Sequence, residues 1–140
     1  KTLSKKQKKE LDKTLKELNK KDENDFDFDD WYAKFIDIYY KKKYNEALED
    51  LEKALAKANG DENKSSAQYN KGITLAKLGE SQKAIEVFDT LIEEFQDSNC
   101  ETTLKQVASA YLQKGFRLAK LGESQKAIEV YDTLIEKFQD

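Results

Sequence analysis

The residues best suited to metal chemistry lie in an acidic segment near residue 25. Asp25, Asp27 and Asp29 alternate along the chain, a spacing similar to that of the first ligands in a calcium-binding loop. Such a loop also needs a central glycine and a closing glutamate, but the glycine is missing and Ile36 stands in the glutamate position. The sequence therefore disfavours calcium binding here and predicts no metal site elsewhere.

Nucleophilic catalysis has few candidate residues in this chain. Cys100 is the single cysteine and histidine is absent, so neither a Ser-His nor a Cys-His pair can form. An enzyme would have to build its acid and base from Asp and Glu alone. Those residues mostly stand one helical turn from a lysine, as Glu80 does from Lys83, which is typical of a solvated helix surface. The sequence predicts a protein that is not an enzyme and holds no cofactor.

The bulk composition indicates a protein surface of mixed charge. Charged residues make up 38% of the chain, hydrophobic residues another 38%, and the net charge is -3. No strongly basic field points to nucleic acid, and no apolar run approaches the roughly 20 residues needed to cross a bilayer. With no signal peptide in the sequence, the expected location is the cytoplasm.

The first 27 residues differ from the rest of the chain. Residues 1–21 carry nine lysines against three acidic residues, and residues 22–30 carry six acidic residues and no basic one. Leucines at positions 3, 11, 15 and 18 form one narrow helical stripe. We interpret residues 1–27 as a basic amphipathic segment with an acidic hinge. It could contact a membrane surface or nucleic acid, or it could be a solvated helix or linker, with Phe26 and Phe28 anchoring the hinge on the first helices after it.

The elements that would position any site come from an internal repeat. Lys71 to Asp97 and Lys114 to Asp140 are identical at 23 of 27 positions, at an offset of 43. A period in the range of about 20 to 50 residues is typical of stacked helical repeats. Apolar spacing predicts an all-α array over residues 28–140, made of antiparallel helix pairs at about 28–61, 65–98 and 100–140. Gly60 is expected to stop the helix of the first pair in a left-handed conformation.

The array resembles the tetratricopeptide-repeat family. The second pair matches its pattern with Gly72, Leu75, Ala84 and Phe88, the third with Tyr111, Gly115, Leu118, Ala127 and Tyr131, and the first with Trp31 and Ala47. Phe35 and Leu51 depart from the pattern in the first pair. The resemblance implies a right-handed superhelix of about three repeats, and the long third pair is similar to longer-period repeats of bacterial members.

The same resemblance implies where a partner would bind. First helices line the concave face in this family, which holds peptides or partner proteins. The residues placed there are Tyr32, Ile36, Tyr39, Tyr69, Asn70, Ile73, Lys77, Phe116 and Lys120. This set predicts a partner with apolar anchors and an acidic group facing the two lysines. Alternatively, Tyr32, Tyr39 and Phe116 pack against neighbouring first helices.

A second surface concerns the last helix of the array. Its apolar residues Ile128, Leu134, Ile135 and Phe138 have no following repeat in this sequence to cover them. We therefore expect a partly uncovered apolar strip that either meets further repeats or pairs with another chain. A homo-oligomer formed through Ile135 and Phe138 is the alternative to peptide binding.

Overall fold

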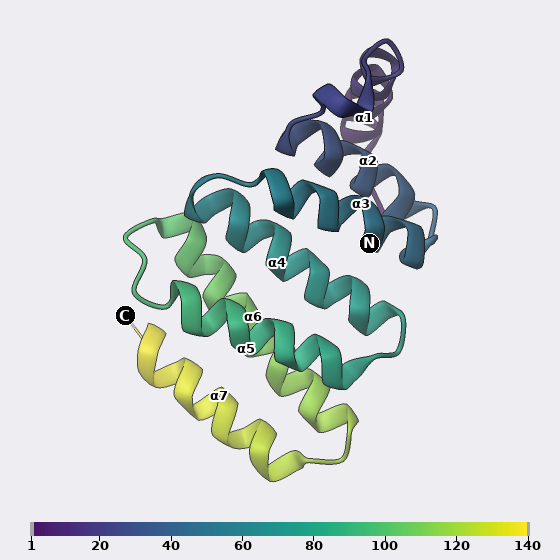
Figure 1. Ribbon diagram of the computed structural model, residues 1–140. Helices are drawn as coiled ribbons and strands as arrows, with labels where there is room; N and C mark the ends of the chain where they lie inside the picture. The colour runs from purple at the N-terminus through teal and green to yellow at the C-terminus, as the bar shows by residue number, and fades with distance from the viewer. Residues whose placement is uncertain (1, 140) are drawn as a thin grey trace. The chain divides into compact units, whose positions relative to one another are not determined.

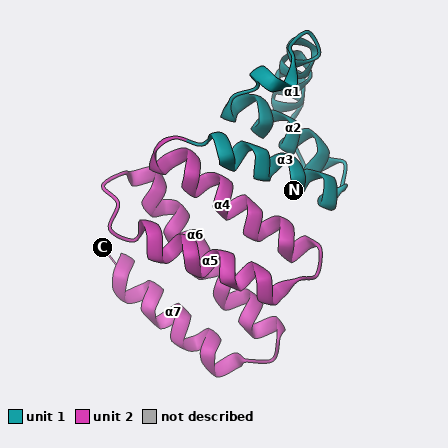
Figure 2. Cartoon of the chain, viewed as in Figure 1, with its two compact units in different colours: residues 1–58 teal, residues 59–140 magenta. Residues whose placement is uncertain are grey.

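The computed structural model describes residues 2–139, and in that range it contains helices and no strand. The elements are α1 (Lys5–Leu18), a short 3-10 helix η1 (Glu23–Asp25), α2 (Phe28–Tyr40), α3 (Tyr44–Lys57), α4 (Gly60–Lys77), α5 (Ser81–Phe95), α6 (Glu101–Lys120) and α7 (Ser124–Phe138) (Figure 1). They fall into two compact units, residues 1–58 and residues 59–140 (Figure 2). The predicted all-helical repeat fold is confirmed.

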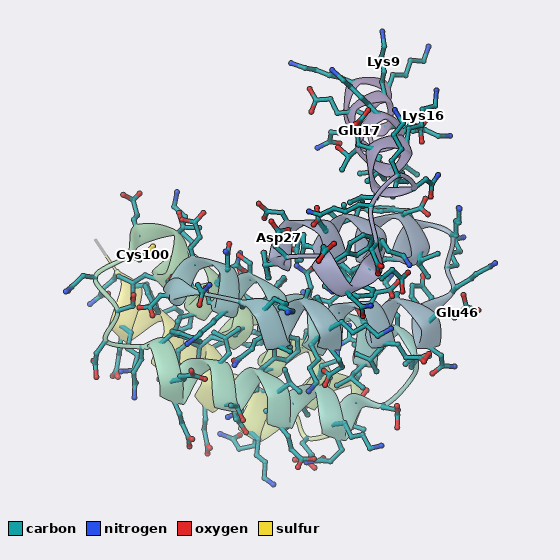
Figure 3. All side chains as sticks on the ribbon, turned by 45° about the horizontal axis from the view of Figure 1, so that its top comes forward. Lys9, Lys16, Glu17, Asp27, Glu46 and Cys100 are labelled. Carbon is teal, nitrogen blue, oxygen red and sulfur yellow. The ribbon has the colours of Figure 1, made fainter. Side chains whose placement is uncertain are left out.

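Unit 1 begins with a helix that its own side chains cap. The Ser4 hydroxyl accepts from the Gln7 backbone N–H at 3.1 Å, and the Gln7 side chain accepts from the Ser4 N–H at 2.9 Å. This reciprocal pair satisfies two backbone donors that a helix start leaves open. Lys9 and Lys16 extend from α1 into solvent (Figure 3). The basic amphipathic segment therefore folds as a helix whose charged residues face water.

The acidic hinge anchors this segment onto the first helix pair. Phe26 and Phe28 are buried, as predicted, and the Phe26 ring meets the Trp31 ring edge-on at 5.0 Å between centroids. Helices α2 and α3 contact each other. Phe35 of α2 and Ala47 and Leu51 of α3 are buried in this unit. Burial of these aromatic rings gives unit 1 a hydrophobic core.

Unit 2 consists of two helix pairs, α4–α5 and α6–α7. Helix α5 contacts both α4 and α6, while α6 contacts α4, α5 and α7. Phe88, Leu91 and Val107 are fully buried between these helices. Helix α6 is therefore the central element of the unit, and α7 lies at its edge (Figure 2).

Two glycines permit the close approach of helices within each pair. A Cβ atom at Gly72 would overlap the ring of Phe88, and one at Gly115 would overlap the ring of Tyr131. Gly72 and Gly115 are therefore positions of close helix packing. A glycine in the middle of a helix costs about 1 kcal/mol relative to alanine. At both positions an aromatic ring fills the space that the missing side chain leaves.

A residue in the left-handed conformation forms the turn within each helix pair. Gly60 is also left-handed, but it lies at the start of α4 and not at the end of α3. Gly79 and Gly122 have φ values of +79° and +82° at the turns within the second and third pairs. Helix α3 ends at Lys57 and Ala58 is extended, so Gly60, with φ +81°, opens α4 instead of stopping α3. The expected helix start near residue 65 is therefore five residues too late, because Asp61 and Glu62 form a favourable acidic first turn.

Candidate functional site

The first helices of unit 2, α4 and α6, form a continuous surface. The Ser65 hydroxyl donates to the Thr103 Oγ1 at 3.3 Å, and both side chains are fully buried. Next to them, the Gln106 amide donates to the Ser66 Oγ at 3.4 Å. Small polar side chains thus hold the two helices against each other. We name the outward side of this pair the first-helix surface, defined by Tyr69, Ile73, Lys77, Leu112, Phe116 and Lys120.

Phe116 is the exposed aromatic side chain of this surface. It is 44% exposed, an unusual degree for a phenylalanine. The Arg117 guanidinium lies 4.6 Å from its ring centroid and the Lys120 Nζ lies 5.4 Å away. Leu112, one helical turn earlier, is also exposed. An apolar patch flanked by two cations is therefore present on α6, a combination that suits a partner with apolar and acidic groups.

Tyr69 and Asn70 of α4 are more engaged with the protein itself than the sequence implies. The Tyr69 ring packs 5.9 Å from the Phe88 ring, and burial raises the pKa of its hydroxyl although a hydrogen bond with Gln113 of α6 opposes that shift. The Asn70 amide donates to the Ser66 carbonyl at 3.0 Å. Both residues are half-buried. Tyr69 and Asn70 therefore support the first-helix surface through contacts inside the protein. Lys77 is exposed to solvent on that surface, and Ile73 is half-buried in it.

The three candidate residues of unit 1 lie on α2. Tyr32 and Tyr39 are half-buried and belong to a row of aromatic rings along the helix. The centroid of the Phe35 ring lies 5.7 Å from that of Tyr32 and 5.5 Å from that of Tyr39. Tyr32 also stacks on Phe28 at 5.2 Å. Their rings thus contribute to the packing of α2 while part of each side chain stays accessible.

Helix α1 lies beside the same face of α2, which the sequence did not predict. A gap of about 310 Å³ separates the two helices, with Leu3, Leu11 and Thr14 on one side and Tyr32 and Ile36 on the other. The leucine stripe of α1 therefore points toward the α2 face that holds these candidates. Leucine periodicity indicates that a helix has an apolar face, but it does not say which neighbour that face will cover.

Arg117 belongs to this part of the surface although helical spacing did not predict it. The duplicated segments differ at four positions, and this is one of them: Arg117 in the second copy corresponds to Thr74 in the first. Thr74 is fully buried, whereas Arg117 is half-buried and its guanidinium reaches over Phe116. Phe116 itself replaces Ile73 at another of the four. The two substitutions between the copies, Phe116 for Ile73 and Arg117 for Thr74, were therefore the signal in the sequence that could have identified this part of the surface.

The acidic hinge and the cysteine have local structural partners. The Asp30 carboxylate accepts from Lys21 at 2.7 Å, and although burial opposes it, this and its other hydrogen bonds hold the Asp30 pKa below its ordinary value. A hydrogen bond from Lys34 lowers the pKa of Glu23. Cys100 precedes α6, and hydrogen bonding with Thr103 lowers the pKa of its thiol. Among the described residues no cluster of three His, Cys, Asp or Glu side chains could hold a metal ion.

A second groove of about 770 Å³ lies between α5 and α7, with α6 as its floor. Two lysines of the groove pair with carboxylates across short distances: Lys114 lies 2.6 Å from Asp89, and Lys126 lies 3.1 Å from Glu123. Tyr111 and Leu118 supply the apolar floor. The Lys114–Asp89 pair joins α6 to α5, and both ion pairs give structural support to the walls of the groove.

Comparison with known protein families agrees with the geometry. A family model described as tetratricopeptide repeat matches residues 66–98 and 106–140. Those two ranges cover most of helix pairs α4–α5 and α6–α7. A search of curated proteins gives no match. No helix over residues 2–139 is long and apolar enough to cross a membrane.

Proposed function

Because the chain belongs to the tetratricopeptide-repeat family, whose repeats generally mediate protein–protein interaction, we propose that it is a non-catalytic scaffold that binds a peptide or partner protein on its first-helix surface. The observation that carries this proposal is the exposed Phe116 with Arg117 and Lys120 over its ring. An exposed aromatic ring beside cations is a favourable anchor for a partner, because it offers contact area at little cost in conformational entropy.

The chemistry of the surface indicates the kind of ligand. Leu112 and Phe116 stand one turn apart and would take apolar side chains, and Ile73 on α4 extends the apolar area. Lys77 and Lys120 occupy equivalent positions on the two helices and are both exposed. We propose a ligand with two apolar side chains and at least one carboxylate, since a carboxylate can pair with either lysine.

The proposal extends to the first helix pair and to location. We propose that residues 28–61 are a divergent third repeat, with Tyr32, Ile36 and Tyr39 as its contribution to binding and residues 1–27 as a separate segment. The aromatic row on α2 supports this extension, because its tyrosines keep part of their surface open. We also propose a cytoplasmic location, supported by a single cysteine and hence no intrachain disulfide.

Selection from a random peptide library displayed on phage tests the proposal. The whole chain is the bait, and we expect enriched peptides to combine aromatic or aliphatic residues with Asp or Glu. Phe116→Ala and Lys120→Glu should each weaken a selected peptide by about tenfold, the loss of one well-placed contact. The matched control is Lys137→Glu on α7, which restores the residue of the other copy, Glu94, and should leave binding unchanged. Peptides that bind all three variants equally well would refute the proposal.

A second candidate function is a structural one, in which the protein self-associates through Ile135 and Phe138. The observation that favours it is their exposure on α7, 59% for Ile135 and 39% for Phe138. Light scattering over a wide concentration range, on the parent and on an Ile135→Lys, Phe138→Glu variant, decides the question. A parent that dimerises and a folded monomeric variant would support self-association, whereas two monomers would exclude it.

A further inference from the structure

Helix α1 carries five lysines on the side opposite its leucines. We name this set the basic stripe and define it as Lys5, Lys6, Lys9, Lys13 and Lys16. Helical geometry places the five within about 100° of the helix circumference, with Leu11, Leu15 and Leu18 on the opposite side. All five lysines are exposed, and Figure 3 shows Lys9 and Lys16 extending outward from α1.

The basic stripe has no ionic partner within the described part of the protein. In unit 2, exposed lysines pair with an acidic residue one helical turn away, as Lys83 does with Glu80 at 3.0 Å. None of the five stripe lysines makes an ion pair with a residue of the range 2–139. The nearby acidic hinge does not supply a partner either, because its Asp30 is paired with Lys21, which lies outside the stripe. Five positive charges therefore remain available to an anion outside the protein.

This arrangement of charges opposes the stability of α1 as a helix. Lys5 and Lys6 stand in the first turn, where the helix dipole favours acidic residues, and that turn contains none. Lys9 lies one turn from both Lys5 and Lys13, and like charges at this spacing repel each other. A dense array of negative charges would relieve both effects on binding. We therefore expect α1 to be more stable as a helix when its basic stripe is occupied.

We propose that the basic stripe docks α1 onto an anionic phospholipid surface. The stripe occupies one side of the helix, and on the other side Leu11 faces α2 across the gap between the two helices. A flat surface meets one side of a helix, whereas the groove of a nucleic-acid duplex surrounds a helix on both flanks. Lysine is also the sole residue type of the stripe, so it offers no arginine fork for bases and no aromatic ring for stacking.

The docking is electrostatic, because the leucines of α1 are directed toward α2 and not toward the lipid. Leu18 is buried, and Leu11 lines the gap beside α2. Each lysine close to an anionic membrane contributes about a fivefold gain in affinity, and salt weakens this attraction. The proposed cytoplasmic location agrees with this partner, since anionic lipids are abundant in the cytoplasmic leaflet. The inference is independent of the peptide-binding proposal, because it concerns the side of α1 that is turned away from α2.

Flotation of the intact chain with lipid vesicles tests the inference. Vesicles of phosphatidylcholine with about 30% phosphatidylserine should bind the chain at low salt, and vesicles of phosphatidylcholine alone should not. A triple variant of the stripe, Lys9→Glu, Lys13→Glu, Lys16→Glu, should bind at least about 100-fold more weakly. The matched control reverses three exposed lysines of unit 2 and should bind like the parent: Lys83→Glu, Lys105→Glu, Lys126→Glu. Circular dichroism verifies that both variants are folded.

Hydrogen exchange followed by mass spectrometry provides a second readout on the same samples. The amides of α1 should exchange more slowly in the presence of the phosphatidylserine vesicles, because the bound lipid relieves the repulsion between the lysines. Exchange in α1 that is unchanged by bound vesicles would contradict the inference. The stripe variant should show no such protection, and the control variant should show it in full.

Four outcomes of the binding experiments would overturn the inference. A parent that binds no vesicles would make the stripe a solvated helix face. Equal losses in the stripe variant and the control would indicate a general effect of net charge. Binding that persists in about 0.5 M sodium chloride would mean that α1 leaves α2 and inserts its leucines into the lipid. Stripe-dependent binding of a double-stranded oligonucleotide, with no binding of vesicles, would assign the stripe to nucleic acid.

Discussion

Lys42 carries the clearest sign of local strain at the scale of single residues. Its φ is +63°, the single positive value for a residue other than glycine among those described, and it occupies the turn position that Gly79 and Gly122 hold in the other pairs. A side chain in this left-handed region costs about 1 kcal/mol. We expect Lys42→Gly to stabilise unit 1 by somewhat less than this, because glycine also loses more entropy on folding.

Urea unfolding of the whole chain, followed by the fluorescence of the single tryptophan, Trp31, measures this effect in unit 1. Gly79→Ala is the matched control: it places a Cβ in the same conformation, φ +79°, with nothing within 4 Å to obstruct it. It should destabilise unit 2, read by circular dichroism. If the Lys42→Gly variant has a lower urea midpoint than the parent, the lysine side chain stabilises the fold by more than its left-handed backbone conformation costs.

Asp30 links the stability of unit 1 to pH. Its carboxylate accepts from Lys21 at 2.7 Å and from the Asp27 backbone N–H at 3.0 Å. Burial alone would raise the Asp30 pKa, but these hydrogen bonds outweigh it and lower that pKa. A carboxyl group with a lowered folded-state pKa stabilises the fold above its unfolded-state pKa of about 3.9, and this contribution is lost as pH falls through the folded-state value.

Asp30→Asn should therefore destabilise unit 1 at neutral pH by about 1 kcal/mol, the usual loss for one side of a capping box. The difference from the parent should shrink as the pH falls below about 4, where the parent carboxylate takes up its proton. Unfolding midpoints measured across this range test the sign. Asp12→Asn, at an exposed position of α1, is the control. A difference between parent and Asp30→Asn variant that stays constant down to acid pH would contradict the account.

The contact of glycine with an aromatic ring governs packing at the scale of helix pairs. Gly72 leaves the space that Phe88 fills, while in the first pair the equivalent positions hold Phe35 and Leu51, so the larger residue lies on the other helix. Both arrangements bury their side chains. We expect Gly72→Ala to destabilise unit 2 by about 1 to 3 kcal/mol through overpacking, and Phe88→Leu to do so by a similar amount through a cavity.

The double variant Gly72→Ala, Phe88→Leu should lose less than the sum of its single variants, because the smaller leucine makes room for the added methyl group. Chemical unfolding of all four proteins gives the coupling free energy. A matched cycle with Gly72→Ala and Ile135→Ala, a residue exposed on α7, should show none. Additivity in the Gly72–Phe88 cycle would refute the packing role given to this glycine.

The helix pairs could be predicted from the sequence because their signals are local. Apolar periodicity and the duplicated segment predict a third pair over about 100–140, and the structure has α6 and α7 within that range, from Glu101 to Phe138. The start of α4 was missed because glycine is a common helix stop, although Asp61 and Glu62 after Gly60 signal a helix start. Lys42 shows a signal that was present but unused: alignment with Gly79 predicts a left-handed residue there.

The site was less predictable than the fold. Spacing identified the residues on first helices, but it could not show that Tyr69 packs on Phe88 or that the Asn70 amide bonds to the Ser66 carbonyl, since both depend on side-chain orientation. The covering of the Ile36 side of α2 by α1 depends on contact between two separate helices, which periodicity does not encode. Exposure of Ile135 and Phe138 was predicted correctly, because it follows from the order of helices alone.

At the scale of the whole molecule, two surfaces of different kind stand on different helices of unit 2. The first-helix surface belongs to α4 and α6 and offers an aromatic anchor with cations, which suits an acidic peptide. Helix α7, a second helix, exposes the apolar residues Ile128, Ile135 and Phe138 around the Asp132 carboxylate.

Chemical-shift mapping of a library-selected peptide on the intact ¹⁵N-labelled chain shows directly whether the first-helix surface binds a partner. We expect the largest shifts on α4 and α6 around Ile73, Lys77, Phe116 and Lys120, and we expect Phe116→Ala to remove them while Lys137→Glu does not. Shifts confined to α5 and α7, or a library that yields no peptide sensitive to Phe116, would contradict the claim that the first-helix surface is the binding site.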